Sequence, residues 1–402
     1  MEKVIFHIDV NSAFLSWEAV YRLNVLGEEL DLRTIPSAVG GDMSKRHGVI
    51  LAKSTPAKKY NIRTGEPIVD ALRKCPGLVL VKPNHALYHE QSAKFLEILN
   101  KYSPTVEQYS IDEAFVDMTG MEKLFGEPVA AAHALKDEVY NTLGFTVNVG
   151  ISSNKLLAKM AGDFEKPDKV HTLFPWEMEK KMWPLPVGDL LFVGKATEKR
   201  LNSLGIRTIG DLAKADLSVL KSVMKKQGEM LYNYANGIDD SGLEPEPEDN
   251  KGYSNSTTIA FDVTDSYTAK RYLKELSENV SQRLRQDDMR ANEVSVMIKY
   301  NDLSKVSHQC ALTASTNITK EIYETACKLF DELWEGVPIR LLGVRAGKVS
   351  HSGTNRQLSL FDTTDYEKLE KLDKAMDKIR GRFGTDAIKP ASFLEKTNID
   401  KK

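Results

Sequence analysis

The sequence is poor in cysteine, and this excludes two classes of protein. Its 402 residues hold three cysteines. Cys75, Cys310 and Cys327 lie far apart and lack the short paired spacing of metal ligands. A disulfide-stabilised secreted scaffold and a cysteine-based zinc site are therefore excluded. We expect free thiols in a reducing cytosol.

The sequence also lacks long uncharged runs and an excess of charge of either sign. No uncharged run approaches the roughly 18 residues that span a membrane. Met1-Glu2-Lys3 leads directly into an apolar strand rather than into a signal peptide. We expect a cytoplasmic protein with no membrane partner. The formal net charge is −2, so a polyanion would have to meet local basic patches.

Three acidic residues, by contrast, stand beside or inside apolar runs. Asp9 follows Val4–Ile8, and the adjacent Asp112 and Glu113 lie inside the stretch Tyr109–Phe115. Carboxylates brought together repel one another and lose hydration, so such a site needs cations. We interpret the three acids as ligands of two Mg²⁺ ions for phosphoryl or nucleotidyl transfer.

Each acidic element also has a plainer explanation. Asp9 at a strand-to-helix junction fits an acid that favours a helix N-terminus, and an Asp-Glu pair beside a turn is usually surface. Successive residues of a strand point to opposite faces. Asp112 and Glu113 can therefore share a site only if the backbone turns or bulges around Ser110–Asp112.

Hydrophobic spacing predicts an α+β fold for the first half of the chain. The expected helices cover 13–26, 85–100, 129–143 and 155–164, and the expected strands cover 4–8, 49–52 and 145–151, with a hairpin at 106–118. Ser12 is the expected N-cap of the first helix. This order favours a ferredoxin-like sheet. The turn-rich stretch 27–84 predicts a minor subdomain, whose basic cluster fits either a triphosphate site or a solvated face.

Three motifs together resemble one family. They are Asp9-Val10-Asn11-Ser12-Ala13-Phe14, Tyr109–Phe115, and Gly150–Lys159, whose lysines suit phosphate. In this order and spacing the chain, over roughly residues 1–361, resembles the Y-family DNA polymerases, the translesion enzymes that include bacterial DNA polymerase IV and UmuC-like polymerases. The resemblance implies a low-fidelity enzyme that adds dNTPs to a primer on template DNA.

The resemblance also implies roles for individual residues. Asp9, Asp112, Glu113 and the backbone carbonyl of Val10 would bind two Mg²⁺ ions. Phe14 would be the steric gate against a ribose 2′-hydroxyl, and Lys166 would contact the triphosphate.

The chain departs from the family pattern at its nucleotide-contacting positions. Thr55 and Lys58 stand where many members carry Tyr and Arg, so the charge remains while the ring and the planar fork are lost. Ala13 replaces the usual aromatic residue before the gate.

The resemblance implies a domain order as well. The palm would comprise 1–26 and 85–174, the fingers 27–84, a helix-hairpin-helix thumb 175–238, a linker 239–252, an α+β little finger 253–350, and a tail 351–402. In the thumb, Gly194 and Lys195 would meet a DNA phosphate, although Phe192 replaces one usual glycine. A plain pair of helices fits the same pattern. DNA-binding candidates in the little finger are Arg271, Arg290, Lys299, Lys305, Arg345 and Lys348.

The tail contains the peptide Gln357-Leu358-Ser359-Leu360-Phe361, which resembles the motif that binds the bacterial sliding clamp. An exposed linker is the alternative, but it would leave three apolar side chains in water. Thr364–Glu367 predicts a capping box for an amphipathic helix carrying Tyr366, Leu369, Leu372, Met376, Ile379 and Phe383. That helix could pack back or bind a partner. We expect a monomer.

Two other functions remain open. A non-catalytic relative would bind DNA and the clamp, but such relatives lose the metal-binding acids, and this chain keeps all three. A nucleotide cyclase uses a similar two-metal palm, but a thumb, a second DNA-binding unit and a clamp peptide argue against it.

Overall fold

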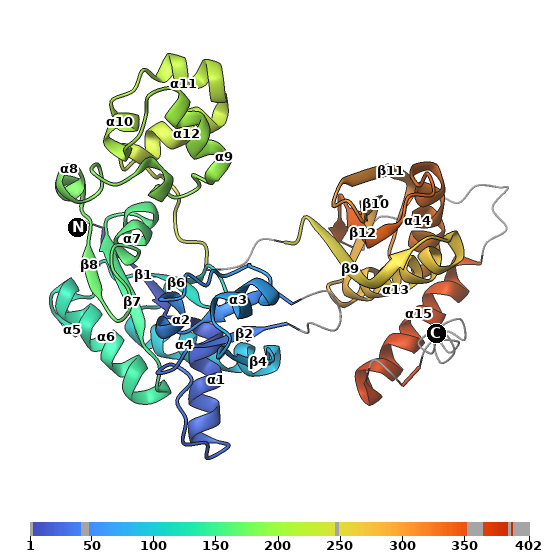
Figure 1. Cartoon of the computed structure of the whole chain (residues 1–402), viewed down its shortest axis with the longest axis horizontal. Coiled ribbons are helices and arrows are strands. Elements are labelled where there is room, and N and C mark those ends of the chain that lie inside the picture. The colour runs from blue at the N-terminus through green and yellow to red at the C-terminus, as the bar shows by residue number, and fades with distance from the viewer. Residues whose placement is uncertain (1–2, 42–47, 246–248, 352–364, 385–386, 389–402) are drawn as a thin grey trace. The chain divides into compact units, whose positions relative to one another are not determined.

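The computed structural model describes residues 3–41, 48–245, 249–351, 365–384 and 387–388. The chain divides into two compact units, residues 1–41 with 48–247, and residues 42–47 with 248–402 (Figure 1). Each unit has its own hydrophobic core, so each is described by itself. The peptide 357–361 lies outside the described residues.

The first unit is built on a five-stranded sheet in the order β5-β6-β1-β7-β8. The strands are β5 (Val106–Gln108), β6 (Glu113–Asp117), β1 (Ile5–Val10), β7 (Val147–Ser152) and β8 (Val170–Thr172). β1 is central and antiparallel to both β6 and β7. The chain therefore reaches one edge through the 106–118 hairpin and the other through β7, as the predicted α+β palm requires.

Alternation along the strands gives the sheet two different faces. Phe6, Ile8 and Val10 point into the main core with residues of α1 (Ala13–Asn24), α4 (His85–Tyr102) and α6 (Pro128–Leu143). The opposite face carries α7 (Lys155–Gly162), which packs on β1 and β7. A Cβ on Gly150 would lie 2.0 Å from the carbonyl oxygen of Ala158, so this close approach requires glycine.

Two smaller elements complete the first unit. A three-stranded sheet contains β2 (Ser37–Gly40), β3 (Ile50–Lys53) and β4 (Val79–Val81), with α2 (Thr55–Lys58) and α3 (Ile68–Lys74) beside it. A helical part contains α8 (Met178–Lys181), α9 (Lys195–Ser203), α10 (Ile209–Ala213), α11 (Leu217–Met224) and α12 (Lys226–Ala235). α5 (Glu122–Phe125) precedes α6. This helical part shares a core with Leu156, Leu157 and Met160 of α7.

The segment after α12 is bound along α7. The Asp239 carboxylate accepts a hydrogen bond from the backbone amide of Leu156 at 3.0 Å. Lys155 donates to Glu107 at 2.7 Å and to the Gly242 carbonyl at 3.3 Å. Glu107 also accepts from the backbone amide of Glu244 at 2.8 Å. We expected phosphate at Lys155 and this helix N-terminus, but the chain's own carboxylates occupy both.

The second unit is a four-stranded antiparallel sheet in the order β11-β10-β12-β9, with a short fifth strand on β10. The strands are β9 (Gly252–Val263), β10 (Met289–Tyr300), β11 (Lys305–Thr316), β12 (Ile339–Gly347) and β13 (Ser350–His351). α13 (Ser266–Gln286) and α14 (Thr319–Leu333) share its core (Figure 1). Arg345 pairs with Ser295 and Lys299 with Lys305, which places these cations on the face opposite the core.

The C-terminal helix α15 (Tyr366–Phe383) packs back onto the second unit through charges. Asp373 and Asp377 both pair with Arg285 of α13, at 3.1 and 2.6 Å. Arg380 pairs with Glu278 at 2.9 Å. The helix therefore packs back, which is one of the two outcomes expected. Of its apolar residues, Leu372, Ile379 and Phe383 are exposed, while Tyr366, Leu369 and Met376 are half-buried beside the buried Asp373 and Arg380.

Most predicted elements are present, with shifted ends. The first helix ends at Asn24 instead of residue 26, and β1 extends through Asp9 to Val10. Ser12 is at the N-cap position, but among the described residues its side chain makes no capping hydrogen bond, and its backbone is left-handed with φ 50°. The N-cap of α15 is Asp365, and Thr364, the first residue of the predicted capping box, lies outside the described residues. Of the helices described, none is long and apolar enough to cross a membrane.

Candidate active site

Two of the three predicted acids meet across neighbouring strands. Asp9 in β1 is directly opposite Glu113 at the start of β6. Directly opposed residues of an antiparallel pair project from the same face, which here is the α7 face. The side chains of Asp9 and Glu113 are 14% and 21% exposed, so both are accessible from that face.

The hairpin turns where the third acid requires it. Residues 110–112 form a bend between β5 and β6. The backbone amides of Tyr109 and Ser110 both donate to the Glu113 carbonyl, at 3.0 and 3.1 Å. The backbone carbonyl of Asp112 accepts from the Val10 amide at 3.0 Å, so Asp112 stays beside the end of β1. Its carboxylate accepts a hydrogen bond from the Ser110 hydroxyl at 2.7 Å.

Lysines neutralise the other two acids. Lys166 lies 2.9 Å from the Asp9 carboxylate and 2.8 Å from that of Asp163. Lys159 of α7 donates to Glu113 in a short hydrogen bond. His7 Nε2 lies 3.3 Å from the same carboxylate. The acids therefore have cationic partners in this structure, as their partial burial demands.

The two carboxyl groups respond differently to these surroundings. Burial raises the pKa of Asp9 above its usual value, and Lys166 only partly opposes this effect. Burial also acts to raise the pKa of Glu113, but hydrogen bonds from His7 and Lys159 outweigh it and lower the pKa to about 2. The pKa of Lys166 is raised, because the charges of Asp9 and Asp163 outweigh its own burial.

The residues fit a Mg²⁺ site in chemistry. Carboxylate oxygens are the ligands that Mg²⁺ prefers, and Asp9 and Glu113 present them from one face, with Asp112 at the adjoining bend. No group of three His, Cys, Asp or Glu side chains converges as a metal centre in the part of the chain described. Asp112 bonds Ser110 while lysines contact the other two acids. Metal binding would require these contacts to be exchanged.

A cavity of about 200 Å³ adjoins Asp9. It is lined by Asp9, Asn11, Ser12, Leu15, Ser16, Arg33, Ser54, Thr55, Lys58, Thr146, Lys166 and Pro167. The structure thus brings the predicted nucleotide residues Thr55, Lys58 and Lys166 to one cavity with Asp9. Three cationic side chains, those of Arg33, Lys58 and Lys166, make this cavity suitable for an anion.

Phe14 lies on the first turn of α1, two residues after the cavity-lining Ser12. Its ring stacks on Tyr88, with centroids 4.4 Å apart and an interplanar angle of 9°. The Tyr88 hydroxyl donates to the buried carboxylate of Glu18 at 3.0 Å. The orientation of Phe14 is therefore set by a side chain that is itself fixed by a buried hydrogen bond.

Sequence reasoning missed several residues of this site. Arg33 donates to both carboxylate oxygens of Asp31 through Nε and Nη2, and to the Gly144 carbonyl through Nη1 at 2.7 Å. Asn11 and Asn148 form a buried hydrogen-bond network beside Asp9. A signal existed for Asn148 and His7, since each is a polar residue inside an otherwise apolar strand. Arg33 had none, because it lies in a loop.

The predicted DNA contact in the helical part is exposed. Gly194 is the N-cap residue of α9, whose first residue is Lys195. The turn at Leu204 and Gly205, where glycine has φ 83°, leads toward α10. This arrangement agrees with the predicted helix-hairpin-helix.

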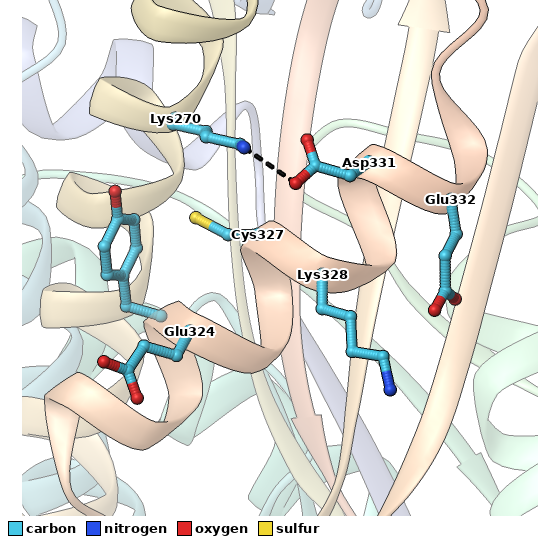
Figure 2. A pocket seen from close by; sticks show the side chains of 7 residues that line it. Lys270, Glu324, Cys327, Lys328, Asp331 and Glu332 are labelled. Atoms are coloured by element: carbon cyan, nitrogen blue, oxygen red, sulfur yellow. Dashed lines mark hydrogen bonds and ion pairs between the residues drawn. The ribbon is translucent and has the colours of Figure 1, made fainter.

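A larger depression, of about 620 Å³, is lined by residues that lie far along the sequence from the three acids (Figure 2). It is on the second unit, between α13 and α14, and an ion pair of Lys270 with Asp331 crosses it at 2.7 Å. Its Cys327 thiol is kept protonated, because burial raises the pKa. The Asp9 cavity, although smaller, is therefore the candidate active site.

Three family models match most of the chain. The impB/mucB/samB family matches residues 8–163, its C-terminal domain matches 250–360, and a thumb domain described for DNA polymerase iota matches 188–239. Together with the palm-type sheet and its acids, these matches define the class of protein. The chain belongs to the Y family of translesion DNA polymerases. It is accordingly a DNA-directed DNA polymerase, a metal-dependent nucleotidyltransferase.

Individual relatives agree over the full length. DNA polymerase IV of Clostridium acetobutylicum is 46% identical over 98% of this chain and 99% of its own. DNA polymerase IV of Acetivibrio thermocellus is 36% identical over 100% of both, and DNA polymerase IV 2 of Bacillus subtilis is 37% identical over 98% and 95%. A solved Y-family DNA polymerase chimera of Dbh and Dpo4 shares the fold, with a TM-score of 0.74, 22% identity and coverage of 87% and 100%.

Proposed function

We propose that this protein extends a DNA primer across damaged template, with low fidelity, by two-metal nucleotidyl transfer. The proposal rests above all on the pairing of Asp9 with Glu113 on one face of the sheet, beside a cavity lined with cations. Family membership supplies the polymerase activity. The geometry of the acids supports the mechanism.

Asp9, Asp112, Glu113 and the Val10 carbonyl would hold two Mg²⁺ ions. Bound there, magnesium would lower the pKa of the primer 3′-hydroxyl and would neutralise the charge that develops on the triphosphate. The Asp112 carboxylate would leave the Ser110 hydroxyl to join the site. The ions would replace Lys159 and Lys166 as the partners of the acids. Lys166 would then be free to contact the triphosphate.

The same cavity would bind the incoming dNTP. Lys166 and Lys58 would contact its phosphates, and Thr55 would line the pocket at the start of α2. Arg33 is held by Asp31 and by the Gly144 carbonyl, so it would form a wall of the pocket rather than a mobile contact. Phe14, fixed on Tyr88, would lie against the sugar and exclude a 2′-hydroxyl.

DNA would be held by two surfaces outside the cavity. Gly194 and Lys195 at the start of α9 would meet a backbone phosphate. In the second unit the helix-free face of the sheet offers Lys299, Lys305 and Arg345 among serines. Arg290 and Lys348 fit less well, because they pair with Glu370 and Glu293. The predicted boundaries of the palm, fingers, thumb, linker, little finger and tail are part of this proposal.

Recruitment would come from Gln357–Phe361 binding an apolar groove of the bacterial sliding clamp. We further propose that the enzyme acts as a monomer in the cytoplasm. Of the competing functions, a non-catalytic DNA-binding relative is disfavoured by retention of all three acids. A cyclase is disfavoured by the full-length match to DNA polymerases.

Primer extension by Asp112→Ala tests the mechanism. We expect extension with Mg²⁺ to fall by at least about 1000-fold, because a metal ligand is removed from the reacting phosphate, while primer–template binding stays within about twofold. Asp117→Ala, at the far end of β6, is the matched control and should extend normally. Near-normal extension by Asp112→Ala would contradict the metal assignment.

A further inference from the structure

Asn148 is a fully buried polar residue in the middle of the sheet, directly opposite Asp9. Its amide nitrogen donates to the carbonyls of Gly162 at 3.0 Å and Glu165 at 2.7 Å. Its amide oxygen accepts from Asn11 Nδ2 at 3.1 Å and from the Lys169 amide at 3.3 Å. A side-chain amide has two donors and two acceptor lone pairs, so the hydrogen-bonding capacity of Asn148 is fully used.

Asn11 continues this network from the other side of Asp9. Its Oδ1 accepts from the Thr146 hydroxyl at 3.0 Å and from the Asp168 amide at 2.9 Å. Asp168 has φ 63°, in the left-handed region that residues with a Cβ rarely adopt. The Asn11 contact holds it there.

The two asparagines together bind the segment 165–169 at three of its residues. Glu165 lies immediately before Lys166, and Asp168 and Lys169 follow it closely, so the backbone is held on both sides of this lysine. The Lys166 ammonium, in turn, reaches Asp9, which is the strand neighbour of Asn148. One network therefore links the residues around Asp9 with the segment that carries Lys166.

We propose that Asn148, acting with Asn11, is a positioning residue that holds Lys166 for the triphosphate of the incoming nucleotide. This rests on the proposed role of Lys166. A lysine side chain is long and loses much freedom when it binds. A backbone fixed on both sides reduces the freedom that remains to be lost, so nucleotide affinity depends on a residue outside the cavity lining.

The test is equilibrium binding of a dNTP to the full-length protein on a dideoxy-terminated primer–template with Mg²⁺, so that no chemistry follows. Asn148→Ala should raise the dissociation constant of the dNTP about tenfold. Asn148→Ser, which retains one polar group, should lie between it and the unsubstituted protein. Hydrogen exchange at the amides of Asp168 and Lys169 should accelerate in Asn148→Ala. Ser152→Ala is the matched control, because Ser152 is equally buried in β7 but donates to Leu173 instead.

A double-mutant cycle separates positioning from general destabilisation. If Asn148 acts through Lys166, then Asn148→Ala should add less than about twofold once Lys166→Ala is present. Additive losses of dNTP affinity in the cycle, or an equal loss in Ser152→Ala, would overturn the role of Asn148 and leave the proposed role of Lys166 intact. The same conclusion would follow if affinity were unchanged in Asn148→Ala and Asn148→Ser while Lys166→Ala weakened binding. An unchanged affinity in Lys166→Ala would overturn the proposed role of Lys166 and, with it, the inference.

Discussion

Phe14 lies in a stack of aromatic side chains rather than alone at the cavity. Its ring is parallel to that of Tyr88 and tilted against that of Trp17, 5.9 Å away. Trp17 and Tyr88 are fully buried. A ring supported in this way does not swing aside at low cost, which is the property that a steric gate requires.

Phe14→Ala should therefore raise ribonucleotide incorporation. We expect the preference for dNTP over rNTP, measured as the ratio of kcat/KM values, to fall by about 10- to 200-fold, the range for losing one steric contact in a pocket. Phe14→Leu retains bulk and should keep most of the preference. Selectivity that survives in Phe14→Ala would assign the gate to another residue.

Glu113 should contribute to the stability of the metal-free protein in a pH-dependent way. Its pKa is about 2 in the folded state, against an ordinary value of 4.5. Its contribution is thus fully present above pH 4.5 and is lost as the pH falls toward 2. Glu113→Gln should reduce the free energy of unfolding by about 2 kcal/mol at pH 7.

Urea unfolding in EDTA, repeated from pH 7 to pH 3, measures this contribution. The difference in free energy of unfolding between the unsubstituted protein and Glu113→Gln should shrink as the solution is acidified. Asp163→Asn is the control, since Asp163 pairs with Lys166 near the same site but is more exposed. A gap that stays constant with pH would contradict the ionised pair with Lys159.

At this scale the sequence predicted the reactive groups better than their partners. The apolar run Val4–Ile8 predicted a strand that ends before Asp9, whereas β1 includes Asp9. The bend at 110–112 was required by the Asp112-Glu113 pair and is present. The lysines that neutralise the acids, and the contact of His7 with Glu113, were not predicted, because these contacts join residues up to 157 positions apart. Such contacts depend on tertiary packing, which local periodicity does not encode.

Among the elements, α15 is the one whose packing the sequence left open. Its apolar spacing predicted an amphipathic helix that could pack back or bind a partner, and the helix meets its unit through Asp373, Asp377 and Arg380. Arg285 is 8% exposed in this contact. Charges buried so far need partners, and the helix supplies them. A hydrophobic pattern reports amphipathicity, but it does not show which face packs when the complementary surface is charged.

Removing one of these charges should loosen the helix. Asp373→Ala takes a carboxylate from Arg285 and an acceptor from the Thr319 amide. We expect the second unit to lose about 2–3 kcal/mol of stability and the amides of α15 to exchange faster. Glu367→Ala removes the exposed pair with Lys371 on the same helix and should cost less than about 0.5 kcal/mol. Equal effects of the two substitutions would show that the buried pairing contributes nothing.

For the whole molecule, element order predicted a first sheet, a turn-rich small subdomain and a second α+β unit. The resemblance, and not the local pattern, implied that the helices between them form a thumb. The course of the segment after α12 was not predicted, because acidic composition and two prolines indicated an unattached linker. Its attachment depends on Glu107 and Lys155, whose pairing joins residues 48 positions apart.

The proposed dependence on the clamp concerns the whole enzyme. Replacing Leu360 and Phe361 by alanine should abolish stimulation by the clamp, since apolar anchors carry most of the energy of such peptides. Synthesis without the clamp should stay within about twofold. Replacing Thr354 and Asn355 by alanine keeps the same length of chain and is the control. Stimulation that persists in the first variant would exclude this peptide as the clamp contact.

The attachment of residues 239–244 along α7 extends the first unit beyond the end of α12. Asp239 is held at the N-terminus of α7, and Gly242 and Glu244 are held by Lys155 and Glu107. A backbone held in this way opens only when those contacts break. Residues 239–244 should therefore resist proteolysis together with the first unit, and Lys155→Ala should make them easier to cleave.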